Sequence, residues 1–180
     1  MITSWVVDAR CLLFGGEFNG GVLGGLLGRL FPKLVFQCVT YDGWSDLERS
    51  VPVTLRSWHV PGDRFVIVRD SDGRDCHAIK QRIVDSCKEI GRDDVLVRIV
   101  CQELEDWYLG DFVALAEAYD SPRVLRHQAK DRFRNPDSVR NPSDAVATLV
   151  GPFRKMEAAR RLGNLVEVER NRSQSFRVVC

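Results

Sequence analysis

The stretch VIVRDSDGRDC, residues 66–76, decides how the rest of the chain is interpreted. Three β-branched residues predict the end of a buried strand, and the carboxylates of Asp70, Asp72 and Asp75 follow within six positions, separated by Gly73. A solvated turn that ends a strand is one interpretation. A pocket that holds a divalent metal ion is the other. The segments on either side must distinguish them.

Apolar, strand-like segments alternate with helical ones along the first two thirds of the chain. We expect strands at 4–14, 33–41, 65–68 and 95–101, and helices at 19–30, 76–90 and 106–119. A further helix should begin at Ser45, with Glu48 completing a capping box. This alternation predicts an α/β fold with a mainly parallel sheet and right-handed crossovers. Ligands bind such sheets at the carboxyl ends of the strands.

Composition and charge suggest a core of residues 1–120 and a small, basic, helical C-terminal extension of residues 121–180 packed on it. The formal net charge is +1, but residues 121–180 hold 13 Lys and Arg against 6 Asp and Glu. A basic extension suits a polyanion such as nucleic acid, although a solvated Arg-rich surface would look the same.

No apolar run is long enough to cross a membrane, and no signal-peptide pattern is present. The six cysteines form no CxxC pair, and their apolar surroundings are typical of small buried side chains in a reducing compartment. The sequence therefore predicts a cytoplasmic protein that does not contact a membrane.

Acidic pairs follow two neighbouring predicted strands. Asp70 and Asp72 come after the third strand, and Glu103 and Glu105 after the fourth. Carboxylates at i and i+2 point the same way while the chain is extended, and neighbouring strand ends lie about 5 Å apart. Four gathered carboxylates repel one another unless a cation lies between them. Oxygen ligands of this kind suit Mg²⁺ or Mn²⁺.

With these motifs in view, the chain resembles an uncharacterised bacterial Toprim-like family, related to OLD-type and abortive-infection nucleases and often encoded beside an AAA-type ATPase. The matching segments run from about residue 30 to the C-terminus and include FVIVRDSDGRDCHAIKQRI, LVRIVCQELEDWYLGD, KMEAARRL and RNRSQSF. The resemblance implies a Toprim-like Rossmannoid three-layer sandwich. It also implies Mg²⁺-dependent cleavage or joining of phosphodiester bonds.

Carried over by position, the resemblance assigns Asp70 and Asp72 to the family's DxD motif, and Glu103 and Glu105 to its ELE segment. The family's first acidic motif matches less well, because Gly15 and Gly16 stand where acids are expected. Glu17 follows one residue later and is the candidate general base.

The predicted function is a Mg²⁺- or Mn²⁺-dependent nuclease acting on DNA or RNA in anti-phage defence, with an ATPase and a second copy of the chain, in a homodimer, as candidate partners. Basic and polar side chains of the C-terminal extension are expected to contact phosphates: Lys155, Arg170, Asn171, Arg172, Ser173 and Ser175. The alternative is that Arg172 pairs with an acid of the protein and the serines cap a turn. The main alternative is a binding or regulatory subunit that keeps the fold without the chemistry. A different phosphoryl or nucleotidyl transferase on the same site is a weaker option.

Overall fold

A parallel sheet of four strands organises the molecule. The computed structural model describes residues 11–180, so most of the strand expected at 4–14 lies outside the described residues. The strands are β1 (Cys11–Gly16), β2 (Phe36–Tyr41), β3 (Arg64–Asp70) and β4 (Val95–Val100). They run in the order β2-β1-β3-β4, and every neighbouring pair is parallel. The predicted α/β class and parallel sheet are confirmed.

Helices connect the strands and then build the C-terminal part of the chain. Those between the strands are α1 (Glu17–Leu30), α2 (Gly43–Ser57) and α3 (Cys76–Glu89). After β4 come α4 (Glu105–Gly110), α5 (Phe112–Ala118), α6 (Pro142–Val150), α7 (Lys155–Gly163) and α8 (Gln174–Val179). Three short 3-10 helices, at Pro122–His127, Asp131–Phe133 and Pro136–Ser138, join α5 to α6. Within residues 11–180, no helix is long and apolar enough to span a bilayer.

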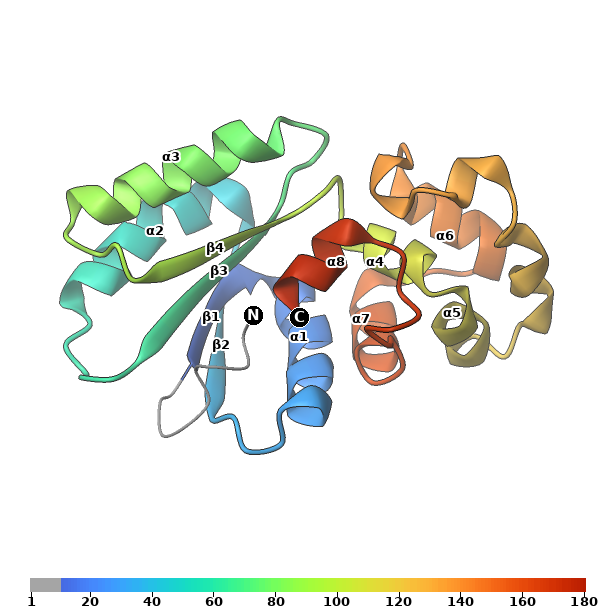
Figure 1. Ribbon diagram of the computed structural model, residues 1–180, viewed down its shortest axis with the longest axis horizontal. Helices are drawn as coiled ribbons and strands as arrows, with labels where there is room; N and C mark the ends of the chain where they lie inside the picture. The colour runs from blue at the N-terminus through green and yellow to red at the C-terminus, as the bar shows by residue number, and fades with distance from the viewer. Residues whose placement is uncertain (1–10) are drawn as a thin grey trace.

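Two helical layers cover the sheet. Figure 1 shows α2 and α3 over one face, and α1 and α8 on the other side. Side chains alternate along β3, as they must in a strand. Phe65 and Ile67 enter the buried cluster formed with α2 and α3, whereas Val66 and Val68 join the cluster on the α1 side. By the same alternation, Asp70 at the end of β3 lies on the same face of the sheet as Val66 and Val68.

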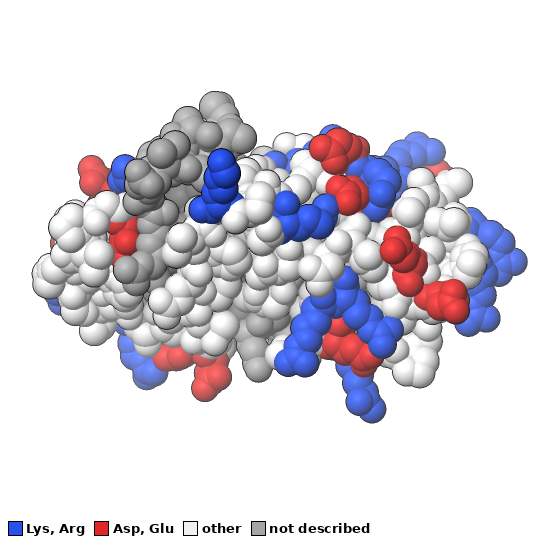
Figure 2. All heavy atoms as spheres, turned by 90° about the horizontal axis from the view of Figure 1, so that it is seen from below, with Lys and Arg blue, Asp and Glu red and all other residues white. Residues whose placement is uncertain are grey.

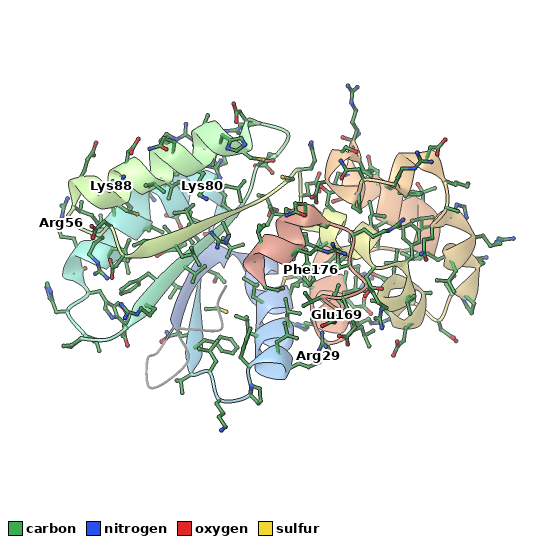
Figure 3. The ribbon with its side chains drawn as sticks, in the orientation of Figure 1. Arg29, Arg56, Lys80, Lys88, Glu169 and Phe176 are labelled. Carbon is green, nitrogen blue, oxygen red and sulfur yellow. The ribbon has the colours of Figure 1, made fainter. Side chains whose placement is uncertain are left out.

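The helices after β4 form the other half of the elongated molecule and share a buried cluster with α1 (Figure 1). Trp107 of α4 meets Phe176 of α8 edge to face, with ring centroids 5.2 Å apart. Figure 3 shows Phe176 between the sheet and the helical half, so the C-terminal helix connects the two. Arg29, labelled in the same figure at the end of α1, pairs with Glu167 at 2.8 Å.

The glycine-rich helix α1 is explained by its close approach to α7. A Cβ added at Gly25 would lie 2.9 Å from the carbonyl carbon of Gly163, and one added at Gly163 would lie 2.7 Å from the carbonyl oxygen of Val22. Real Cβ atoms do not come so close to backbone. The small residues therefore let two helix backbones touch, which offsets the poor helix propensity of glycine.

Two local predictions were wrong. The capping box at Ser45 is not formed: α2 begins at Gly43, and Glu48 instead pairs with Arg69 of β3. The helix expected over 106–119 is divided at Asp111, whose carboxylate caps α5 by accepting from the N–H of Ala114 at 3.1 Å. In both places, a tertiary contact or a cap overrides the local periodicity. Gly91, which directly follows the C-cap residue of α3, has a φ of 75°, a backbone conformation typical of glycine after a helix end.

Candidate active site at the carboxyl edge of the sheet

The candidate site lies where β1 and β3 end side by side. Helix α1, which follows β1, and helix α3, which follows β3, lie on opposite faces of the sheet (Figure 1). In open parallel sheets, the strand ends at such a divergence are the usual position of a ligand. The register pairs Gly15 with Val68; helix α1 begins at Glu17, two residues after Gly15, and β3 ends at Asp70, two residues after Val68. The side chain of Glu17 lies outside the described part of the structure.

The charges of Asp70 and Glu105 both act on one buried phenol, that of Tyr108. Tyr108 is 1% exposed, and its pKa is raised well above its usual value by burial and then by the charges of Glu105 and Asp70. Asp70 is half-buried at the end of β3. One carboxylate from each of the two predicted acidic pairs is therefore brought to this edge.

Asp72 is not arranged as expected, because the chain stops being extended after Asp70. Its φ of 50° is left-handed, and its backbone N–H donates to the carbonyl of Gln102 at 2.9 Å. Its charge acts on Arg69, which lies on the opposite face of β3 from Asp70. The prediction that Asp70 and Asp72 point the same way is therefore wrong in this conformation.

Glu103 and Glu105 do lie together, and a lysine compensates their charge. The Nζ of Lys155, at the start of α7, lies 3.0 Å from an oxygen of Glu103 and 3.4 Å from an oxygen of Glu105. Glu105 is almost fully buried, and Ser143 donates a hydrogen bond to Glu103. Segments about 50 residues apart thus meet in a carboxylate–lysine cluster, which we define as Glu103, Glu105, Ser143 and Lys155.

The surroundings in this cluster shift the pKa values of the two glutamates in opposite directions. Burial raises the pKa of Glu105, and the charge of Lys155 only partly opposes it. Burial also acts to raise the pKa of Glu103, but hydrogen bonds from Ser143 and Lys155 outweigh it and the pKa is lowered. Burial acts to lower the pKa of Lys155, yet the charges of Glu105 and Glu103 raise it overall. The cluster therefore holds one carboxyl whose pKa is lowered beside one whose pKa is raised.

A four-carboxylate metal centre is not formed by these side chains. Over the described residues, no group of three or more His, Cys, Asp or Glu is arranged to hold a metal ion. Mg²⁺ often needs less, since one or two protein carboxylates with waters and substrate phosphates complete its shell. Asp70, half-buried at the end of β3, could supply one such carboxylate.

Three of the expected phosphate-binding residues are interior instead. Asn171 and Ser173 are fully buried, and Ser175 is 4% exposed. Asn171 donates to the carbonyl of Trp107 at 2.8 Å, while Asp137 accepts from Ser173 Oγ at 2.6 Å and from the Ser175 backbone N–H at 2.9 Å. These side chains hold the last helix against α4 and do not face a nucleic acid in this conformation.

The arginines of the same segment also have internal partners. Arg170 pairs with the buried carboxylate of Asp111 at 3.1 Å, and Arg172 lies over the ring of Phe112. The basic surface is found on α7, where Arg154, Arg160 and Arg161 line an open depression of about 520 Å³. Figure 2 shows basic side chains gathered over the helical half of one face, interspersed with acidic ones.

Several site residues could not be found from sequence reasoning. In the sequence, Tyr108 looks like an ordinary residue of an apolar segment, and Ser143 like an ordinary residue of a turn. Only the fold brings them to the carboxylates. Asp106 is fully buried, and the charge of half-buried Asp137 acts on it. The one available signal was the acidic run ELED, in which three acids precede a tryptophan.

Comparison with known proteins gives a family and no function. A family model described as "Domain of unknown function (DUF4276)" matches residues 27–179, which include β2–β4 and the whole carboxylate–lysine cluster. No curated protein matches the chain. No solved structure matches it either.

Proposed function

We propose that this chain, which belongs to the DUF4276 family, is a Toprim-type, Mg²⁺-dependent nuclease that hydrolyses phosphodiester bonds. The observation that supports the proposal is that β1 and β3 are parallel neighbours paired up to Gly15 and Val68, with Glu17 two residues after the one and Asp70 two residues after the other. An acid from the first strand end and an acid from the third are the two groups that the Toprim resemblance requires there.

The chain's own residues supply three functions in this proposal. Glu17 orients or deprotonates the attacking water. Asp70, with Glu17 beside it, holds the divalent ion, which when bound neutralises charge on the scissile phosphate. The ammonium of Lys155 compensates the charges of Glu103 and Glu105. In this proposal it also attracts a phosphate to this edge of the sheet. The exposed arginines of α7 would contact the nucleic-acid backbone further along.

The decisive experiment is cleavage of supercoiled plasmid and of single-stranded RNA by the full chain with Mg²⁺, with Mn²⁺ and with EDTA. We expect cleavage only with metal, and a loss of at least about 100-fold in Asp70→Asn and in Glu17→Gln. Asp72→Asn should lose less than about tenfold, because Asp72 lies on the Arg69 side of the strand.

Asp93→Asn, an exposed substitution next to β4, is the matched control and should cleave like the wild type. Wild-type activity in Asp70→Asn would exclude the proposed site. Loss of activity in the control as well would show that the losses do not report on the carboxylates that were replaced. Circular dichroism of each variant shows whether the fold is retained.

A second candidate function is a binding or regulatory subunit without catalysis. It is favoured by Lys155, which already neutralises the Glu103–Glu105 pair and leaves less need for a metal ion. Calorimetric titration with Mn²⁺ separates the two: binding that is lost in Asp70→Asn favours the nuclease, and no binding at millimolar metal favours the regulatory subunit.

The expected setting of the nuclease follows from the same resemblance. We propose a role in anti-phage defence within the cytoplasm, with an AAA-type ATPase as partner and with a homodimer as a possible assembly. Co-expression of the chain with an ATPase encoded beside it, followed by size-exclusion chromatography, would show whether the two proteins form a complex.

A further inference from the structure

Two cysteine sulfurs meet at the edge of the sheet, beside the candidate site. Cys76 is the first residue of α3, Cys101 directly follows β4, and their sulfurs lie 3.4 Å apart as free thiols. We propose that Cys76 and Cys101 form an oxidative modification site, closed to a reversible disulfide by a small disulfide such as oxidised glutathione. This inference does not depend on the nuclease proposal.

The backbone around the two thiols already holds them together. Ser71 and Asp72 donate their N–H groups to the carbonyls of Val100 and Gln102, both at 2.9 Å, and the N–H of Gln102 donates to Ser71 Oγ at 2.8 Å. Bonded sulfurs lie about 2.05 Å apart, so closure needs an approach of little more than 1 Å. Both cysteines are half-buried, which leaves room for a small oxidant.

The surroundings assign different roles to the two sulfurs. Burial raises the pKa of Cys101 to about 12, with the hydrogen bond and charge of Cys76 adding to the rise. Cys101 is therefore held as the thiol, and the first attack falls to Cys76. Cys76 thiolate displaces one glutathione thiolate and forms a mixed disulfide. Cys101 then gives up its proton, attacks the Cys76 sulfur and releases the second glutathione.

Two thiols of the protein are thus oxidised while one glutathione disulfide is reduced to two thiols. The new bond would tie the loop that carries Asp72 to the segment that carries Glu103 and Glu105, and would close the chain over α3 and β4. Restricting the unfolded chain in this way should raise the melting temperature by roughly 5–10 °C.

The test uses the full reduced chain, incubated with oxidised glutathione, blocked with an alkylating reagent, and digested without reduction. Mass spectrometry should find one peptide pair joined through Cys76 and Cys101, which separates after treatment with dithiothreitol. In Cys101→Ser, the mixed disulfide of glutathione with Cys76 should accumulate. In Cys76→Ser, Cys101 should stay a thiol.

Cys38→Ser is the matched control, because Cys38 is also half-buried but lies on β2. It should form the bridge and gain the same rise in melting temperature as the wild type. Separate alkylation of Cys76 and Cys101 in the treated wild type would overturn the proposal, even if a variant fails to fold. So would a different pairing, or an equal rise in melting temperature in treated Cys76→Ser.

Discussion

Asp106 is a fully buried acid beside other acids. Its pKa is raised to about 9, mainly by burial, and the charges of Asp137, Glu103 and Glu105 add to the rise. The backbone N–H of Glu103 acts in the opposite direction and lowers it. An unfolded aspartate titrates near pH 3.9, so between about pH 4 and pH 9 the folded state holds a proton that the unfolded state lacks. The stability that this proton contributes is complete below about pH 4 and is lost as the pH rises toward 9.

Asp106→Asn should remove this dependence. We expect the free energy of unfolding of the wild type to fall between pH 5 and pH 9 more steeply than that of the variant. At pH 8 the variant should be more stable by about 2 kcal/mol. Urea unfolding at several pH values checks this, with exposed Asp93→Asn following the wild type. Parallel pH profiles for wild type and Asp106→Asn would contradict it.

Residue-level prediction of the site succeeded in part. From the positions of the strand ends, we expected Asp70 and Glu105 at one edge of the sheet. The charges of both do act on the phenol of Tyr108. It failed at Asp72, because the turn at φ 50° ends the extended geometry on which the argument depended. It could not find that Lys155 compensates the glutamates, since nothing local in the sequence marks a contact 50 residues away.

At the scale of elements, the packing of α1 on α7 depends on glycine at selected positions only. A Cβ at Gly25 would collide with the backbone of α7, whereas a Cβ at Gly28 would meet nothing within 4 Å. Gly25→Ala should therefore destabilise the protein by about 1–3 kcal/mol, and Gly28→Ala should stabilise it by about 0.5–1 kcal/mol. Thermal unfolding of the two variants measures the contrast, and effects of the same sign would refute the proposed contact.

The spacing of apolar residues predicted the elements whose structure follows from the local sequence, such as β3, β4 and α3. Gly91 follows α3 with a positive φ. It misplaced the start of α2, because the buried guanidinium of Arg69 recruits Glu48 away from any cap. The contact of α1 with α7 joins segments some 140 residues apart. Only the low helix propensity of α1 hinted that such a contact was needed.

At the scale of the whole molecule, the question is whether residues 1–120 form an independent unit. The buried cluster runs from Val22 and Leu26 of α1 through Trp107 of α4 to Leu162 of α7 and Phe176 of α8. Cutting the chain at residue 120 would expose this apolar surface and leave Glu105 without Lys155. A unit that loses so much of its core does not retain a stable fold.

We therefore expect the fragment 1–120 to be unfolded or aggregated, and the full chain to unfold in one transition. Near-ultraviolet circular dichroism, which follows the packing of Trp107, and far-ultraviolet circular dichroism, which follows the helices, should give coincident melting curves for the full chain. The fragment should show no dispersed amide signals in its NMR spectrum. A folded fragment, or two separated transitions in the full chain, would show instead that the C-terminal helices form a separate domain.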